Sequence, residues 1–480
     1  MGWRSLDVEL VEEPGGALPP PAADRTAARR ATIARVLRRW WPLLVVVLAG
    51  VVGWQLLAER QDRAATQALR ATPGVVGTTV APPLTATPWG GAGALAVLAD
   101  PVRGEDGTLA GPVLAPTGGW DVVVLDAEDG DELWRAAVTE PEPRAATGAF
   151  VACEGDGRPA RTLACLVQTE RYDPGPGELA VASRLVHVDL VARTVEPVRD
   201  LPPGSSAAVA GDLLVAAENR PGTTGGAGSI VVTATDLSTG GPRWRAEVAG
   251  AFPAGAGAPA VRWRDGYVLV HGPATMWALD PADGRVRASG LDLQVLRDGG
   301  LVDAPGSSAT RLFAADGAPA ATLGGTPLGV DPDDGSAPGL LVLREFDGAA
   351  GGTLRAVETG TGAPVWEAAL DRDLVSPAVL LGGVLYVSDG PAVRALDART
   401  GAARWASTGG PDVGARLVSD GVHLLRVELD MATGDQVLAA YALADGARTW
   451  AAPLPEQVDA LLVLDGRLFG QLGNQLSRIG

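Results

Sequence analysis

The sequence predicts an all-β fold built from repeated four-stranded units and preceded by one apolar helix. Three observations support this prediction. The 480 residues include 64 glycines and 37 prolines, more turn formers than a helical protein usually contains. Short runs of alternating apolar residues recur along the chain. A motif of an acid, a glycine and a tryptophan is repeated at fixed spacing, which indicates a repeat architecture.

Length and charge limit what the chain can be. It is about three times as long as the roughly 150 residues typical of one domain, so several domains or one large repetitive domain are expected. A hydrophobic content of 46% with 20% charged residues excludes a disordered polyelectrolyte. The 39 basic residues are all arginine and are outnumbered by 57 acids, which leaves a net charge of -18. Nucleic acid is therefore not an expected partner.

The first expected element is a transmembrane helix over residues 40–58, WWPLLVVVLAGVVGWQLLA, which carries no charge. A helix of this length crosses roughly 28 Å of hydrocarbon, enough for one span. Residues 25–39 hold six arginines, whereas residues 59–73 hold three. Because positive residues favour the cytoplasmic side, we expect a single-pass protein of the cell membrane with a cytoplasmic N-terminus and an extracytoplasmic remainder.

Other interpretations of this stretch fit less well. A signal peptide would have a charged region of nearly 40 residues and lacks a small-residue cleavage site after Leu57. The first cysteine is Cys153, so a lipidated cysteine beside the stretch is not expected. A buried helix of a soluble protein would need a polar face, and no polar face interrupts this run.

The expected organisation has four parts. A disordered cytoplasmic tail covers residues 1–39, the transmembrane helix residues 40–58, an extracytoplasmic stem residues 59–74, and the repeat domain residues 75–480. The tail carries a net charge of +2, and the part from residue 59 onward therefore carries -20. Such a surface favours solubility and repels anionic lipid headgroups.

The repeated motif places a glycine four residues after an acid and a tryptophan four residues after the glycine. Four copies keep this spacing: Asp126, Gly130 and Trp134; Asp236, Gly240 and Trp244; Glu358, Gly362 and Trp366; and Asp397, Gly401 and Trp405. Two copies are degenerate, because Gly446 and Trp450 follow Ala442, while Asp280 and Gly284 precede Ala288. Weaker copies lie around residues 188–198 and 313–321.

The spacing has a structural explanation. The apolar run before the acid is a half-buried strand, and the acid-to-glycine segment is a tight turn in which glycine takes a positive φ and the acid accepts turn N–H groups. The tryptophan then lies on the returning strand. Two further short strands precede the motif, as in residues 377–390 and 208–219. The interval between motif acids is mostly 39 to 46 residues, and four strands in such an interval are typical of a propeller blade.

The motif ALDARTGAARW at residues 395–405 resembles the tryptophan-docking repeat of the pyrroloquinoline-quinone-type β-propellers. This superfamily, the quinoprotein alcohol dehydrogenase-like proteins, includes quinone-dependent dehydrogenases and non-enzymatic scaffolds, and the similarity extends over residues 75–480. The resemblance implies that the motif tryptophans pack between neighbouring blades. The blade-docking residues would be Trp89, Trp134, Trp244, Trp366, Trp405 and Trp450 with the acids Asp126, Asp236, Asp280 and Asp397 and the glycines Gly130, Gly240, Gly284, Gly362, Gly401 and Gly446.

The number of blades and the closure of the ring are less directly readable. Similar propellers commonly have eight blades, whereas up to nine units can be counted here, so we expect about eight. The chain ends on a strand that no motif tryptophan follows, while residues 83–89, PLTATPW, form an isolated strand that ends in Trp89. We expect this early strand to complete the last blade and thereby to remove an open sheet edge.

The chain departs from the dehydrogenases of this superfamily in its cysteines. Their quinone is held against a disulfide between adjacent cysteines, with calcium and a carboxylate base beside it. The two cysteines of this chain, Cys153 and Cys165, are separated by eleven residues and cannot form that ring. They fall on two consecutive predicted strands, so we expect a structural disulfide that closes one hairpin.

No other chemical site is expected from the sequence. The three histidines, His187, His271 and His423, lie far apart without metal-ligand spacing. The segment DPDDG at residues 331–335 resembles part of a calcium loop but lacks the full pattern, so a turn explains it. Trp120, Trp263 and Trp277 lie outside the motif and are candidates for a surface or channel role, although packing is favoured for them too. We therefore predict no catalytic residue, no cofactor and no metal.

The sequence favours a non-catalytic binding or scaffolding module at the cell envelope, with an envelope protein or a glycan as partner. The alternative is a quinone-dependent dehydrogenase with a divergent cofactor site. A third hypothesis is a sensor that signals through the single helix to the cytoplasmic tail, where residues 7–13 could dock a partner. The fold does not decide among them, because function depends on the site.

Overall fold

The computed structural model describes residues 48–480 apart from residues 92, 100, 140–149, 156–158, 173–178, 202–204, 223–227, 253–258, 307–308, 315, 347–350, 372–376 and 414–415. The chain forms two compact units, Met1–Ala65 and Thr66–Gly480.

Residues 48–65 of the first unit are helical, and the helix continues to residue 70. The expected tail and the first eight residues of the expected transmembrane segment, 40–47, lie outside the described residues. Within the described part of the chain, no helix combines the length and the apolar character that crossing a membrane requires.

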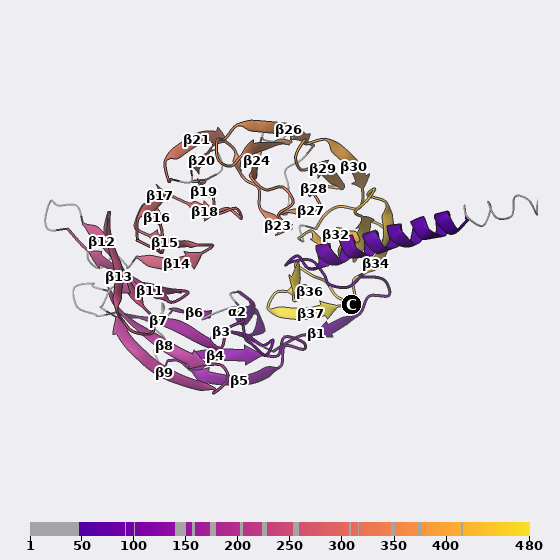
Figure 1. Cartoon of the computed structure of the whole chain (residues 1–480). Coiled ribbons are helices and arrows are strands. Elements are labelled where there is room, and N and C mark those ends of the chain that lie inside the picture. The colour runs from indigo at the N-terminus through magenta and orange to yellow at the C-terminus, as the bar shows by residue number, and fades with distance from the viewer. Residues whose placement is uncertain are drawn as a thin grey trace, which may run out of the picture. The chain divides into compact units, whose positions relative to one another are not determined.

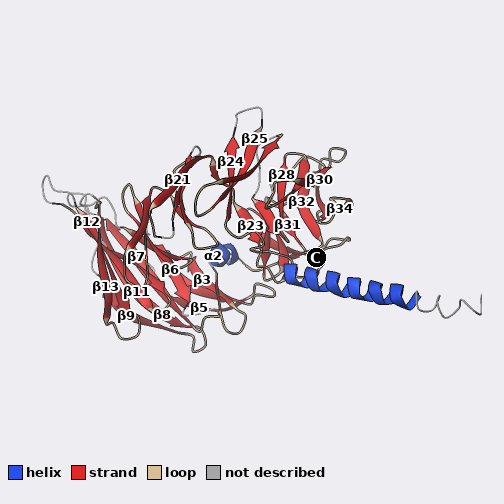
Figure 2. Ribbon diagram, turned by 45° about the horizontal axis from the view of Figure 1, so that its top comes forward, coloured by secondary structure: helices blue, strands red, loops and turns tan. Residues whose placement is uncertain are grey.

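Residues 66–480 form a β-propeller whose described strands make nine sheets, here called blades 1 to 9, arranged around a ring in chain order (Figure 1). Almost all of the unit is strand and loop (Figure 2). The all-β propeller of four-stranded blades is therefore confirmed. The expectation of about eight blades is corrected to nine, because the weak copies around residues 188–198 and 313–321 each complete a full blade.

The first five blades follow one another without interruption. Blade 1 comprises β2 (Val102–Arg103), β3 (Leu109–Leu114), β4 (Trp120–Leu125) and β5 (Glu132–Ala137). Blade 2 comprises β6 (Phe150–Gly155), β7 (Thr162–Tyr172), β8 (Leu179–Asp189) and β9 (Thr194–Leu201). Blade 3 comprises β10 (Ser205–Ala210), β11 (Leu213–Arg220), β12 (Ser229–Asp236) and β13 (Pro242–Ala249). Blade 4 comprises β14 (Ala260–Arg264), β15 (Tyr267–His271), β16 (Met276–Leu279) and β17 (Val286–Gly290). Blade 5 comprises β18 (Leu293–Val295), β19 (Leu301–Asp303), β20 (Ala309–Phe313) and β21 (Pro319–Gly324).

The last four blades include two departures from the simple order. Blade 6 comprises β22 (Thr326–Pro327), β24 (Leu340–Phe346), β25 (Gly352–Glu358) and β26 (Pro364–Leu370). Blade 7 comprises β27 (Ala378–Leu381), β28 (Val384–Asp389), β29 (Ala392–Asp397) and β30 (Ala403–Thr408), with β23 (Val330–Asp333) added beside β27 in parallel. Blade 8 comprises β31 (Val418–Ser419), β32 (His423–Leu429), β33 (Gln436–Ala442) and β34 (Arg448–Pro453). Blade 9 comprises β35 (Ala460–Leu464), β36 (Arg467–Leu472), β37 (Gln475–Ile479) and β1 (Ala86–Pro88).

The ring closes by strand exchange. Strand β1 pairs antiparallel with β37 and supplies the fourth strand of blade 9. Just beyond the pair, the Thr85 N–H donates to the Gly480 carbonyl at 2.7 Å, and the Gly480 N–H donates back to Thr85 at 3.1 Å. The predicted completion of the last blade by the segment that ends in Trp89 is confirmed. A short helix, α2 (Ala94–Ala99), then packs against β3 on the way into blade 1.

The hydrophobic core lies between blades. The described buried residues form nine apolar clusters, and each cluster joins two consecutive blades. The cluster around Trp89 joins blade 9 to blade 1, so the closing junction is packed like the others. Each sheet thus buries apolar side chains on both faces, which explains the long apolar runs in the central strands.

The antiparallel order gives the ring two distinct faces. Turns between the first and second strands and between the third and fourth strands lie on one side, here called the motif face because it carries the acid-to-glycine turns. Turns between the second and third strands, and the links between blades, lie on the other side, here called the connection face. The chain enters the ring at the motif face, where Val76 donates to the Ser419 carbonyl at 2.8 Å and Gly77 to the Gly466 carbonyl at 2.7 Å.

The DPDDG segment lies on and after β23. Asp334 accepts the N–H of Gly382 at 2.6 Å, Asp333 pairs with Arg297 at 3.1 Å, and Asp331 pairs with Arg416. Its carboxylates therefore join the segment to three blades instead of converging on one point.

Candidate functional site

The motif tryptophans lie at blade junctions. Three of the motif indoles donate a hydrogen bond to a backbone carbonyl of the following blade. The pairs are Trp244 with Pro281 at 2.6 Å, Trp366 with Ala398 at 2.8 Å, and Trp405 with Leu443 at 3.0 Å. Each indole thus contributes both apolar area and a polar contact across its junction.

The motif glycine of the following blade lies against the indole. A Cβ atom added at Gly401 would stand 2.7 Å from Trp366, and at Gly284 and Gly446 the nearest indole atom would be closer still. A Cβ at Gly130 would stand 2.7 Å from Trp89 of the closing strand. These glycines also have φ between 68° and 76°, a conformation in which residues with a side chain are strained. Tryptophan and glycine recur together because one packs on the other across the junction.

Two motif glycines lack an indole partner. Nothing lies within 4 Å of a Cβ added at Gly240, because β9 of the preceding blade contains no tryptophan. A Cβ at Gly362 would meet Ala321, which occupies the tryptophan position in blade 5, at 2.6 Å. Trp134 and Trp450 are half-buried and pack in the clusters that join blades 1 and 2 and blades 8 and 9.

The motif acids organise the turns on the motif face. Each accepts the backbone N–H of the residue two positions on; the pairs are Asp126 with Glu128, Asp236 with Ser238, Asp280 with Ala282, and Asp397 with Arg399. Hydrogen bonds lower the pKa of Asp397 to about 2; the bond from Arg404 has the largest effect, and the bond from the Thr400 hydroxyl has the second largest. The sequence analysis missed a turn of this kind at Asp430, which joins β32 to β33 on the opposite face.

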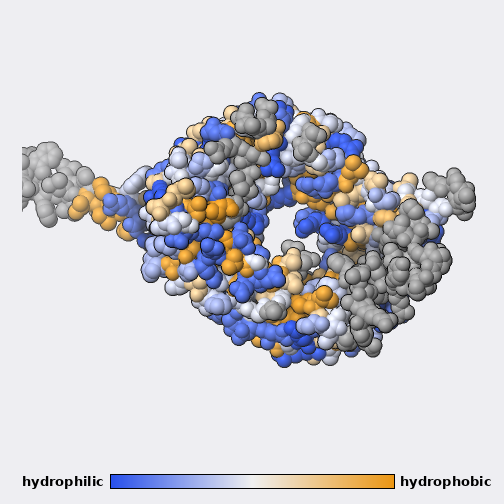
Figure 3. Space-filling view, turned by 180° about the vertical axis from the view of Figure 1, so that it is seen from behind, coloured by the Kyte–Doolittle hydropathy of each residue, from blue (hydrophilic) through white to orange (hydrophobic). Residues whose placement is uncertain are grey.

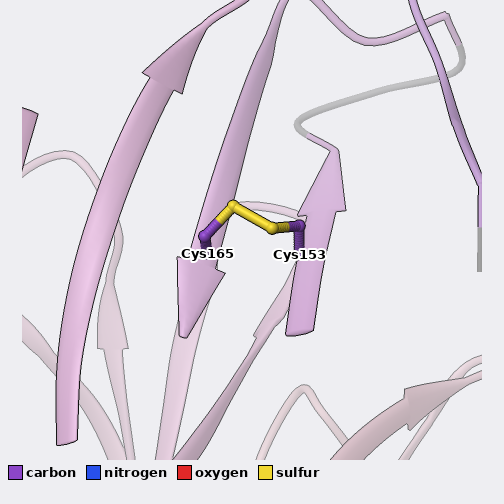
Figure 4. The surroundings of a disulfide bond; sticks show 2 residues. All are labelled: Cys153 and Cys165. Atoms are coloured by element: carbon purple, nitrogen blue, oxygen red, sulfur yellow. A yellow bond between two sulfur atoms is a disulfide. The ribbon is translucent and has the colours of Figure 1, made fainter. Parts of the chain in front are cut away.

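The two cysteines form a disulfide across neighbouring strands of blade 2 (Figure 4). Cys153 on β6 is directly opposite Cys165 on β7, and both are buried. The predicted structural disulfide is confirmed. It lies in the apolar cluster between blades 1 and 2.

The other candidate tryptophans belong to the packing between blades. Trp277 is 8% exposed and lies in the cluster that joins blades 3 and 4, against which Trp263 packs. Trp120, at the start of β4, packs against the cluster between blades 1 and 2. An opening is visible at the centre of the ring from the side opposite to that of Figure 1 (Figure 3).

A set of buried carboxylates was not identified from the sequence. Asp303, Asp389 and Glu428 are at most 1% exposed and end, or nearly end, the second strand of blades 5, 7 and 8. Each accepts backbone N–H groups from the link that enters its blade. The donors are Leu291 and Asp292 for Asp303, Asp371 for Asp389, and Gly410 for Glu428. These carboxylates therefore fix the links on the connection face.

Arginines neutralise all three carboxylates. Arg311 pairs with Asp303, and Arg394 pairs with Asp389 at 3.0 Å. Burial raises the pKa of Asp303, but the hydrogen bonds from the Asp292 backbone and from Arg311 outweigh it, so the net pKa is below the usual value. The signal was present in the sequence, because each apolar run LVD, LYVSD and LLRVE ends in an acid. The role of each acid depends on a link between blades that the fold brings close to the carboxylate.

The most extensive cluster centres on Arg426 and Glu428, which are both fully buried. The guanidinium donates to the Glu428 carboxylate at 2.6 Å and to the carbonyls of Gly390, Pro391 and Gly410 at 3.1 to 3.2 Å. These carbonyls come from blade 7 and from the link between blades 7 and 8. One arginine thereby connects three backbone segments at the connection face.

Glu428 has further donors. It accepts from Arg448 at 2.9 Å and from the Tyr441 hydroxyl. The pKa of Tyr441 is raised to about 12, mainly by burial of its hydroxyl and to a smaller extent by the hydrogen bond to Glu428. A Cβ at Gly409 would collide with that hydroxyl, so the link passes the cluster only with glycine at this position.

The cluster of Arg426 and Glu428 has a structural role. Both oxygens of the Glu428 carboxylate accept hydrogen bonds from protein groups, and the carboxylate has no contact with solvent. A general base needs to reach the proton that it removes, and Glu428 reaches only protein groups. We therefore assign the cluster to positioning of the connection-face loops.

The residues do not fit the quinone site implied by the resemblance. The cysteines pair across strands in blade 2, so no disulfide between adjacent residues is available to pack against a quinone. Within the described ranges, no group of three or more histidine, cysteine, aspartate or glutamate side chains is arranged to hold a metal ion.

Comparison with known proteins identifies the repeat. Residues 339–462 match the family model described as outer membrane protein assembly factor BamB, of the PQQ_2 type. The match covers blades 7 and 8 and parts of blades 6 and 9. The chain thus carries PQQ-type propeller repeats, as its sequence predicts. No curated protein matches the chain.

Solved structures of propellers are also similar. BamB from Moraxella catarrhalis has 16% identity and a TM-score of 0.33, and the match covers 65% of this chain and 99% of that one. A europium-containing methanol dehydrogenase has 13% identity and a TM-score of 0.32, with coverages of 70% and 81%. The quinohemoprotein alcohol dehydrogenase ADHIIG from Pseudomonas putida HK5 has 13% identity and a TM-score of 0.36, with coverages of 87% and 81%. Similarity at this level is not evidence of a shared function.

Replacement of Gly401 by alanine is expected to destabilise the protein more than the same change at Gly240. Both glycines have φ near 70°, so both variants lose about 1 kcal/mol from backbone strain. Only Gly401→Ala also forces a methyl group into the Trp366 indole, which adds about 1–3 kcal/mol. The midpoints of urea unfolding measure the difference, and equal midpoints for the two variants would contradict the docking role of the indole.

Replacement of Asp397 by asparagine is expected to lower stability in a pH-dependent way. Because the folded pKa of Asp397, about 2, lies below its unfolded value, its stabilisation is complete above about pH 4 and is lost as the pH falls toward 2. The difference in melting temperature between wild type and Asp397→Asn should therefore be largest near pH 6 and shrink toward pH 2. A difference that is independent of pH would show that the charge of this carboxylate does not contribute.

Replacement of Arg426 by methionine is expected to cost about 3–5 kcal/mol, because it removes a charge partner of the fully buried Glu428. The matched control is Arg404→Met, which breaks the pair with Asp397. Since the Arg404 side chain is 48% exposed, this change should cost less than about 1 kcal/mol. Urea unfolding of both variants provides the measurement. Equal losses would mean that the buried cluster does not fix the loops.

Proposed function

We propose that the chain is a membrane-anchored, extracytoplasmic β-propeller that acts as a non-catalytic binding or scaffolding module for envelope proteins. The match of residues 339–462 to the model of an outer membrane protein assembly factor is the observation that carries this proposal. The uncharged stretch at residues 40–58 and the arginines before it support a membrane anchor with the propeller outside.

The buried polar groups support the non-catalytic part of the proposal. The buried carboxylates accept hydrogen bonds from backbone groups and arginines, and they hold the connection-face loops in place. Loops that are ordered before binding lose less conformational entropy when a partner docks. A rigid ring that displays fixed loops is suited to recognition, since binding residues are often carried by loops on a rigid scaffold.

Crosslinking tests the scaffold role in the organism that makes the protein. The tagged full-length chain is crosslinked in intact cells, purified in mild detergent and compared with an equally tagged, unrelated single-span protein. We expect the same envelope protein to be enriched at least tenfold in each repeat. Equal recovery with both tagged proteins would contradict the scaffold role.

Two controls address the remaining parts of the proposal. Protease added to intact cells should digest the propeller, whereas protection of the propeller would contradict its extracytoplasmic location. The purified full chain mixed with pyrroloquinoline quinone and calcium should not reduce dye with alcohols or sugars above the rate without protein. Reduction that depends on the quinone would overturn the non-catalytic assignment.

A further inference from the structure

The fourth strand of each blade lies at the periphery of the ring, and its outer edge pairs with no described strand. Such edges are open to pairing with another chain, and natural proteins usually protect them with charged residues. The outer strands β5, β9, β13, β17, β26, β30 and β34 each contain at least one arginine, glutamate or aspartate. In most blades, charged residues on the outer strand thus disfavour pairing of its edge with another chain.

Strand β21 is the exception among the outer strands longer than three residues. Its sequence, PAATLG, carries no charge over residues 319–324, and its one proline, which also disfavours edge pairing, is the first residue, so Ala320 to Gly324 contain neither a charge nor a proline. Ala320 and Thr322 are exposed, whereas Ala321 and Leu323 are half-buried and pack in the cluster between blades 5 and 6. The strand pairs only with β20, and in Figure 1 no labelled element lies outside it.

We propose that the outer edge of β21 binds an extended segment of a partner protein by β-sheet addition. The proposal rests on the scaffold role above and names the surface and the form of the partner. Outward-facing N–H and C=O groups of the strand would supply main-chain hydrogen bonds to a segment of about six residues. The small side chains of Ala320 and Thr322 leave room for the side chains of the added strand.

Charge selects the occupant. The chain has a net charge of -18, so two copies repel each other, and pairing of β21 with a second copy is disfavoured. A basic segment of another protein is attracted instead. The recognition is mainly through the backbone, so the partner is defined by an extended conformation and by arginine or lysine among its residues.

The direct test uses a defined peptide and the full-length protein in detergent. The probe is an acetylated peptide of alternating arginine and valine, six residues long, and its control carries N-methyl groups on alternate amides. We expect the probe to slow amide hydrogen exchange at residues 319–324 at least tenfold and to leave β17 (residues 286–290) unchanged, while the N-methylated peptide has no effect. Protection confined to other strands, or equal effects of both peptides, would overturn the proposal.

Paired variants locate the binding edge. Thr322→Lys places a charge in the middle of β21 and should weaken peptide binding at least tenfold. Ser289→Lys places the same charge on the exposed face of β17, which already contains Arg287, and should leave binding unchanged. Both positions are exposed, so both variants should fold. Because Thr322 lies opposite Arg311, Thr322→Lys should lower the melting temperature slightly, whereas Ser289→Lys, opposite Trp277, should leave it unchanged. Equal binding by the two variants would overturn the proposal.

The crosslinking experiment separates this proposal from the scaffold role. If Thr322→Lys loses the envelope partner that wild type and Ser289→Lys retain, both proposals are supported. If all three proteins retain it, the scaffold role stands and the β21 proposal fails. If none recovers a partner while the peptide still protects β21, the edge binds extended segments and the scaffold role fails. A Thr322→Cys variant that forms a disulfide-linked dimer in solution would identify a second copy as the occupant and overturn the proposal.

Discussion

Packing of each blade against the next is the interaction on which the rest of the structure depends. A four-stranded sheet with two apolar faces is not stable alone in water, and each face here is covered by a neighbouring blade. The indole of one blade lies against the glycine of the next, so the motif joins two sheets and not one hairpin. Every blade needs a neighbour on both of its apolar faces, and a closed ring is the arrangement in which each blade has two neighbours. Strand exchange in blade 9 closes this ring.

Polar groups have different structural roles on the two faces of the ring. On the motif face, half-buried acids such as Asp397 close turns through local N–H groups and nearby arginines. On the connection face, the fully buried acids Asp303, Asp389 and Glu428 reach between blades to hold links that would otherwise have unpaired backbone N–H groups. Arginine accompanies both sets, but only the buried set is costly to disturb, because a carboxylate without contact to water needs its partners.

The repeat and its consequences were predictable from the sequence, whereas long-range polar contacts were not. The spacing of acid, glycine and tryptophan specified a four-stranded unit, and the isolated strand before Trp89 indicated how blade 9 is completed. The disulfide followed from two cysteines on consecutive strands. The ninth blade was uncertain, because the motif is weak in blades 2 and 5, where Pro197 and Ala321 occupy the tryptophan position. Glu428 and Arg426 could not be recognised, since their partners come from blade 7 and the following link. The crossing of β23 to blade 7 likewise leaves no periodic signal.

The pairing of β1 with β37 has a consequence for how the protein is made. Thr85 contacts Gly480, so β1 cannot pair with β37 until the chain has been synthesised as far as residue 480. During that interval blade 1 has no partner on one side, and the strand that will cover it is unpaired. Intermediates with such open surfaces tend to aggregate. Any cleavage that removed β37 would leave β1 without its pairing strand and would open the ring between blade 9 and blade 1.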